Sequence, residues 1–145
     1  MTMTEADTRS VVVEREFPHA PEKLWRALTQ PHLVEEWLMK NDFKPVVGHA
    51  FTLHAQPQPG WDGVIGCEVL VVEPRKTLSY TWNSGEGDLA IQSVVTLSLT
   101  PKGGGTLLRM EQTGFRPDQK QNYHGAKYGW EHFLGRLDQV LAKVG

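Results

Sequence analysis

The hydrophobic period of this chain changes near residue 121, and that change constrains the fold more than any other feature. Over residues 50–112 apolar and polar side chains alternate, as around Phe51 and Leu53, with the period of two that is typical of half-buried strands. Over residues 121–144 no proline occurs and apolar side chains recur every three or four positions, which predicts about six turns of amphipathic helix. A sheet with one apolar face and a helix with one apolar side can bury each other. The pattern therefore predicts an α+β domain.

Within the alternating region, the apolar residues of each predicted strand stand at every second position, so they face the same side of the sheet. The turn-forming stretch at residues 57–63, PQPGWDG, predicts a loop between two of these strands, and the glycines at 103–105 predict a hairpin. The residues predicted to face inward are Phe51, Leu53 and Ala55; Ile65, Cys67, Val69 and Val71; Leu78, Tyr80 and Trp82; Ile91, Val95, Leu97 and Leu99; and Leu108, Met110 and Gln112.

One strand and two short helices are predicted before this region. Residues 11–17 alternate, and Pro21 suits the first turn of a helix. Because a residue before proline disfavours the helical conformation, the first helix should end near Thr29 and a second should begin at Pro31. Residues 1–9 lack periodicity and are expected to be a flexible N-terminus, followed by a single domain over 10–145 with about six antiparallel strands.

Composition excludes several classes of function. The 145 residues carry a net charge of −2 without a block of like charges, which argues against nucleic-acid binding. No apolar run approaches the ~20 residues of a membrane span, and the N-terminus lacks the pattern of a signal peptide, so a cytoplasmic location is expected. The single cysteine, Cys67, cannot form an intrachain disulfide.

Several motifs, in order along the chain, resemble one known family over residues 11–144. They are the strand-to-helix passage FPHAPEKLWRALTQPHLVEEW, Gly48 with Phe51, the strand pair GCEVLVVEPRKTLSYTW, the hairpin SVVTLSLTPKGGGTLLRMEQTGF, and Gly129 with Trp130. This set resembles the START-like (SRPBCC) superfamily and, within it, the group named for homologues of the Hsp90 ATPase activator.

The resemblance implies a helix-grip fold, in which the long helix lies across a curved antiparallel sheet and leaves a cavity between them. Members of the superfamily include lipid and polyketide binders, aromatase/cyclases, self-sacrificing resistance proteins and a eukaryotic co-chaperone domain linked to the stress response. Because one fold serves so many activities, function has to be argued from the site.

The candidate ligand-binding residues are large or amphipathic side chains expected to face this cavity. Alternatively, the same side chains simply fill the core. Gln112 is the polar exception, and its buried amide would need partners that a ligand or water could supply, unless it faces solvent at the end of the sheet. The candidates are Trp37, Phe51, Cys67, Tyr80, Trp82, Val95, Met110, Gln112, Tyr128, Trp130, Leu134 and Arg15.

For Arg15, the cysteine and the histidines, the sequence leaves few possible roles. Arg15 either meets an acidic ligand in the cavity or extends its guanidinium to solvent, while Cys67 is interpreted as a small buried apolar residue. His49 and His54 are five residues apart and so face opposite sides of a strand, and the helical pair His124 and His132 is interpreted as part of a solvated face. No metal ligation, catalytic residue or cofactor is predicted.

The leading hypothesis is a non-catalytic carrier or sensor that binds a small apolar or aromatic, lipid- or polyketide-like molecule. The entrance is expected near the PQPGWDG loop and the start of the long helix. Two alternatives stay open: an enzyme of cyclase or hydrolase type that uses the same cavity, and a co-chaperone-like module that binds a protein partner.

Overall fold

The computed structural model describes residues 9–85 and 90–144 and has one sheet and three helices. The strands are β1 (Arg9–Phe17), β2 (Lys40–Asn41), β3 (Ala50–His54), β4 (Val64–Glu73), β5 (Thr77–Ser84), β6 (Ile91–Lys102) and β7 (Gly105–Phe115). The helices are α1 (Pro21–Thr29), α2 (Pro31–Trp37) and α3 (Lys120–Lys143). Most of the segment expected to be a flexible N-terminus, residues 1–8, lies outside the described residues, and Arg9 already belongs to β1.

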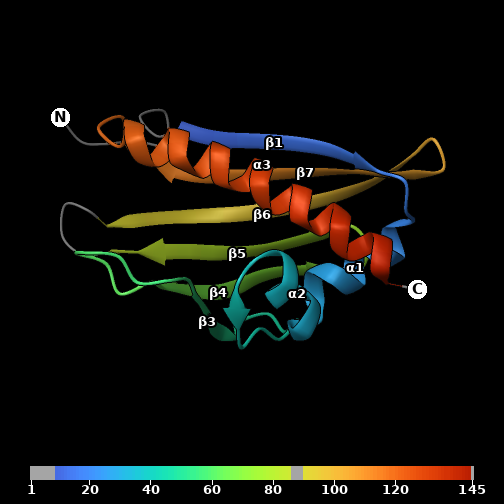
Figure 1. The fold of residues 1–145 in the computed structure, drawn as a ribbon, viewed down its shortest axis with the longest axis horizontal. Helices are drawn as coiled ribbons and strands as arrows, with labels where there is room; N and C mark the ends of the chain where they lie inside the picture. Colours follow the sequence, from blue (N-terminus) through green and yellow to red (C-terminus); the bar gives the residue numbers. More distant parts are fainter. Residues whose placement is uncertain (1–8, 86–89, 145) are drawn as a thin grey trace.

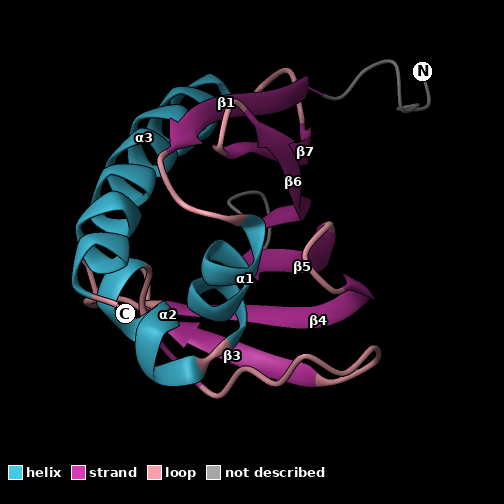
Figure 2. Cartoon of the chain, turned by 90° about the vertical axis from the view of Figure 1, so that its right-hand side faces the viewer, coloured by secondary structure: helices cyan, strands magenta, loops and turns pink. Residues whose placement is uncertain are grey.

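The seven strands form one antiparallel sheet in the order β1-β7-β6-β5-β4-β3-β2. The sheet curls, and all three helices lie on its concave side (Figures 1 and 2). The predicted α+β helix-grip architecture is confirmed. The seventh strand is the two-residue β2, which is too short to produce a period in the sequence.

The helices begin and end where the prolines require it. α1 starts at Pro21, and α2 starts at Pro31 after a single extended residue, Gln30. Proline fixes its own φ near the helical value and pushes the preceding residue toward an extended conformation, so one helix ends and the next begins within two residues. α2 ends at Trp37, whose indole Nε1 donates a hydrogen bond to the carbonyl oxygen of Ala27 in α1 at 2.8 Å.

One strand departs from its predicted parity. The pairing of β4 with β5 shifts register between Val69 and Val71, which marks a β-bulge. Val69 is fully buried, whereas Val71 is 36% exposed and Val72 packs against the core instead. The prediction that Val71 faces inward was wrong, because a bulge inserts one residue and reverses every side chain beyond it.

α3 crosses the concave face diagonally (Figure 1) and makes its main contacts with β1, β7, α1 and α2. The helix therefore contacts one edge of the sheet, β1 and β7, and the two short helices more than it contacts the middle strands. The space between the helix and β4–β6 has to be spanned by side chains, and this position decides where a ligand can enter.

Candidate functional site

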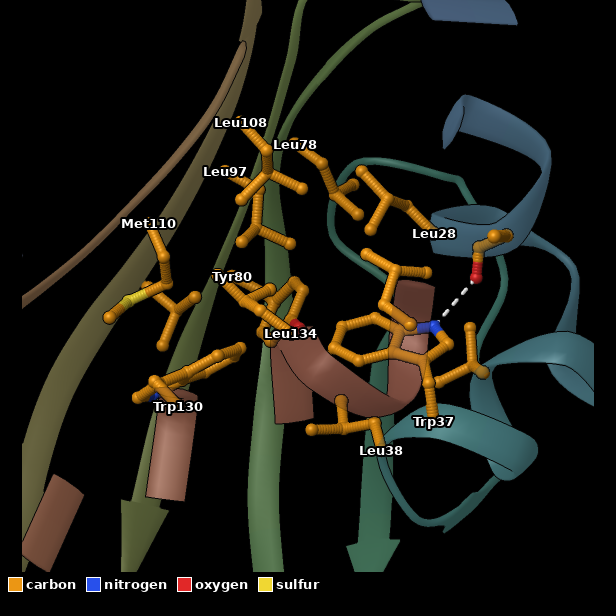
Figure 3. Packing of buried hydrophobic residues seen from close by; sticks show 14 of the residues in the cluster. Leu28, Trp37, Leu38, Leu78, Tyr80, Leu97, Leu108, Met110, Trp130 and Leu134 are labelled. Atoms are coloured by element: carbon orange, nitrogen blue, oxygen red, sulfur yellow. Dashed lines mark hydrogen bonds between the residues drawn. The ribbon is translucent and has the colours of Figure 1, made fainter. Parts of the chain in front are cut away.

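Aromatic rings fill the centre of the space between helix and sheet. The Trp130 ring lies 5.5 Å from the Trp82 ring, 6.4 Å from the Trp37 ring and 5.6 Å from the Phe133 ring, between centroids. Figure 3 shows Trp37 and Trp130 pointing into the same interior as Tyr80 and Leu134. The alternative that these side chains form the core therefore holds for the middle of the fold.

Most of the candidate residues belong to this packed core. Phe51 and Tyr80 meet edge to face at 5.3 Å between ring centroids, and burial raises the pKa of the Tyr80 hydroxyl far above its usual range. The candidates that are buried in the core and do not line the cavity described below are Trp37, Phe51, Cys67, Tyr80, Val95, Met110 and Leu134.

Gln112 is held by a chain of hydrogen bonds inside the protein. Trp130 Nε1 donates to Gln112 Oε1 at 2.9 Å, Gln112 Nε2 donates to Ser93 Oγ at 2.9 Å, and Ser93 Oγ donates to the Trp82 carbonyl oxygen at 2.8 Å. Gln112 is 2% exposed, so it does not face solvent. Its amide needs neither a ligand nor water, because two protein side chains satisfy it. Gln112 thus fixes the orientation of Trp130.

An open cavity of about 260 Å³ lies at the end of the fold where the first half of α3 faces the ends of the strands. This is the location predicted for the entrance. Of the twelve candidates, Trp82, Gln112 and Trp130 line it; the remaining lining residues are Met39, Trp61, Ile65, Ser84, Ile91, Phe115, Asn122, Gly125, Ala126, Gly129 and Phe133. A more polar hollow of about 500 Å³ shares Trp61, Ser84 and Ile91 with it. We refer to the 260 Å³ space as the mouth cavity.

Trp61 lines the mouth cavity and belongs to a constrained loop. Gln58 and Trp61 exchange two backbone hydrogen bonds, of 3.0 and 2.8 Å, across the Pro59–Gly60 turn. Gly63 has φ +80°, and a Cβ there would lie 2.5 Å from the carbonyl oxygen of Ala55, so a side chain at this position is excluded on both counts. These constraints hold the backbone that carries Trp61 in one position.

Two of the twelve candidates lie outside both the packed core and the mouth cavity. Arg15 has the inward parity of β1, but its guanidinium reaches the exposed side of α3 and lies 3.2 Å from the Asp138 carboxylate, with 42% of its side chain exposed. Tyr128 is 78% exposed. Tyr128 precedes Trp130 by two positions on α3. At ~100° per residue, two positions turn a side chain to the other face of the helix.

Cys67 is buried, and its surroundings do not activate the thiol. Burial raises the pKa of its thiol to about 12, and the negative charge of Asp42 adds to the shift. A neutral thiol is a poor nucleophile, so Cys67 acts as a small apolar residue.

We expect this burial to make stability fall at high pH. The unfolded thiol ionises near its ordinary pKa of 9.0 while the folded thiol stays protonated up to about 12, so stability is fully present below pH 9.0 and is lost as the pH rises toward 12. Urea unfolding at pH 8 and pH 10 should show a loss about 1 kcal/mol larger for the native protein than for Cys67→Ala. Equal losses would mean that solvent reaches the thiol.

The described residues form neither a metal-binding cluster nor a membrane-spanning helix. Within residues 9–85 and 90–144, no group of three or more His, Cys, Asp or Glu side chains is placed to hold a metal ion. No helix in the described part of the chain has the length and apolar character needed to cross a membrane.

Comparison with known proteins places the chain among relatives of one family. Residues 18–142 match the family described as Activator of Hsp90 ATPase homolog 1-like protein, and no curated protein matches. The solved structure of protein MLL2253 from Mesorhizobium loti shares 61% identity with a TM-score of 0.88, covering 94% of this chain and 99% of that one.

Two further solved structures are more distant. DynU16, from the dynemicin biosynthetic locus, is 26% identical with a TM-score of 0.76, and the match covers 92% of this chain and 47% of DynU16. CalU16 from Micromonospora echinospora is 26% identical with a TM-score of 0.75, covering 97% of this chain and 81% of CalU16.

Proposed function

The chain belongs to the family of Activator of Hsp90 ATPase homolog 1-like proteins, and on that premise we propose that it binds a small apolar or aromatic molecule in the mouth cavity, without catalysis. The observation that carries this proposal is the cavity itself. Aromatic and aliphatic side chains from the loop, the strands and α3 converge on a space that the protein leaves unfilled. Apolar cavities of this kind are the usual sites of small-molecule binding.

The size of the mouth cavity limits the ligand. A dry apolar cavity of about 150 Å³ holds benzene, so one of 260 Å³ has room for one or two rings or a short acyl segment. Because Trp37, Trp82 and Trp130 fill the space beyond, a long lipid chain would have to displace the core. Among lipid- or polyketide-like molecules, the proposal is therefore restricted to the small ones. The dynemicin locus of the neighbour DynU16 supports a small-molecule role.

The lining favours binding over acid–base chemistry. The residues described as lining the cavity are apolar, aromatic, Gly, Ser, Asn or Gln, none of which titrates near neutral pH. Among the polar side chains that line it, Gln112 already has its partners in Trp130 and Ser93. We therefore propose a carrier or sensor in preference to a cyclase or hydrolase.

Titration with 1-indanone, a neutral two-ring ketone, tests the proposal. We expect saturable 1:1 binding in calorimetry, with amide chemical-shift changes concentrated on the loop around Trp61 and on α3 from Asn122 to Phe133. Residues 102–105 in the β6–β7 turn, at the opposite ends of these two strands, should stay unchanged. Shifts that do not saturate, or that spread evenly over the surface, would contradict a site in the mouth cavity.

A further inference from the structure

A chain of hydrogen bonds joins three strands and the long helix beside the mouth cavity. It runs from Trp130 in α3 through Gln112 in β7 and Ser93 in β6 to the carbonyl oxygen of Trp82 in β5, with donor–acceptor distances of 2.9, 2.9 and 2.8 Å. Trp130, Gln112 and Ser93 are 1%, 2% and 5% exposed. The polar groups of this chain are therefore paired inside the protein and shielded from solvent.

The packing around position 112 does not by itself call for a polar side chain. The residues opposite Gln112 on the two neighbouring strands are Val11 and Val95, which are 1% and 0% exposed. An apolar pair at positions 112 and 130 would also suit these surroundings, because replacing both partners of a buried hydrogen bond by apolar groups can leave stability nearly unchanged. What the hydrogen bond adds is direction, since it holds the two groups that it joins in one orientation. The chain of hydrogen bonds thus points to a positioning role for Gln112.

The group that Gln112 holds is the Trp130 ring, which separates the mouth cavity from the core. Trp130 lines the cavity together with Trp82 and Phe133. Its ring also lies 6.4 Å, between centroids, from that of Trp37, which is buried and does not line the cavity. Figure 3 shows both rings in the packed interior. A ligand reaches past Trp130 only if this ring turns, and turning would break the hydrogen bond to Gln112.

We propose that Gln112 sets the size limit of the ligand, because it holds Trp130 in the orientation that closes the inner end of the mouth cavity. A small ring compound then fits, while additional length finds no further buried space. This inference rests on the proposed function of the mouth cavity and identifies the residue that keeps the cavity short. Gln112 acts through Trp130, and Ser93 supports it by accepting a hydrogen bond from Nε2, which leaves Oε1 directed at Trp130.

Three phenyl ketones that differ only in chain length test the proposal: acetophenone, butyrophenone and hexanophenone, each longer than the one before by two methylene groups. By calorimetry on the native protein, butyrophenone should bind at least about 5-fold more tightly than acetophenone, because a buried methylene contributes about 4-fold in affinity. Hexanophenone should bind at most about 2-fold more tightly than butyrophenone, because its last two methylenes find no buried space.

Variants of the hydrogen-bond chain should remove this limit. In Gln112→Leu the Trp130 N–H has lost its acceptor, so the native orientation of the ring is no longer favoured. The affinity ratio between hexanophenone and butyrophenone should rise to at least about 10-fold, because the added methylenes become buried. Ser93→Ala removes the group that orients the Gln112 amide, and it should raise the same ratio even if Gln112→Leu folds poorly.

Thr106→Val is the matched control. Thr106 is a buried residue of the same strand, its hydroxyl donates to the His19 carbonyl oxygen at 2.7 Å, and it does not line the cavity. This variant also loses a buried hydrogen bond, yet it should keep the native ratio, because a general loss of stability affects all three ketones alike.

The possible results separate this inference from the proposed function. If hexanophenone already binds the native protein about 10-fold more tightly than butyrophenone, or if neither Gln112→Leu nor Ser93→Ala changes the ratio, Gln112 does not set a size limit, although the cavity remains the binding site. If neither 1-indanone nor any of the three phenyl ketones binds the native protein, the proposed function and this inference are overturned together.

Discussion

Trp130→Ala should lower the free energy of unfolding by about 3–5 kcal/mol, the range for removing a large buried aromatic side chain. Trp130 is 1% exposed and packs against Trp37, Trp82 and Phe133. Its removal opens a void and also leaves the Oε1 atom of Gln112 without its donor. Both effects destabilise the folded state, since the cavity forfeits contacts and the buried amide loses a hydrogen bond.

Urea unfolding followed by circular dichroism measures this change. Tyr128→Ala is the matched control, because Tyr128 is an aromatic residue on the same helix that is 78% exposed, and its loss should stay within about 0.5 kcal/mol. A loss below about 1 kcal/mol for Trp130→Ala would show that Trp130 does not anchor α3 to the sheet.

The periods of the sequence were sufficient to predict the α+β class and most of the elements, while the helix-grip arrangement followed from the resemblance to the START-like superfamily. Pro21 and Pro31 determine where α1 and α2 begin, and alternation predicts β3 and β5 to β7 with the correct inward parity. The proline-free amphipathic tail predicts α3 to within one residue at each end. In each case the signal is local, because a proline or a short run of alternating residues decides the local structure.

The bulge in β4 is a feature that such local signals cannot predict. All four residues of the segment 69–72 are compatible with a strand. Their order in the sequence does not indicate where the extra residue of the bulge lies. The choice is made by pairing with β5, which is a tertiary contact. The exposure of Val71 therefore could not be predicted from its neighbours.

The site was predicted less completely than the fold. Trp82, Gln112 and Trp130 were identified because their parity points inward, but parity cannot separate a packed core position such as Met110 from a position that borders a cavity. Trp61 was missed as a site residue because it lies in a loop with no period. A tryptophan among prolines and glycines in PQPGWDG was the available signal, since so large an apolar side chain in a turn usually packs against something.

Gly129→Leu should abolish most binding without weakening the fold. Gly129 lines the mouth cavity from α3, and a Cβ added there would meet only Phe133 Cε2, at an ordinary contact distance of 4.0 Å. The four carbon atoms of the new side chain then compete with the ligand for 260 Å³. We expect the affinity for 1-indanone to fall by at least about 30-fold, because even one methylene of misfit changes affinity by about 10-fold or more.

The stability of Gly129→Leu should not fall, and this distinguishes occlusion of the mouth cavity from unfolding of the protein. Glycine inside a helix is less favourable than other residues by about 1 kcal/mol, so Gly129→Leu should keep or raise Tm. Gly135→Leu is the matched control: it makes the same substitution on α3, its Cβ would meet only the Arg15 guanidinium at 4.0 Å, and it does not line the cavity. Gly135→Leu should bind 1-indanone as the native protein does. If Gly129→Leu also binds with native affinity, the ligand lies elsewhere, and the more polar hollow beside Gly60 and Asp62 becomes the site to test.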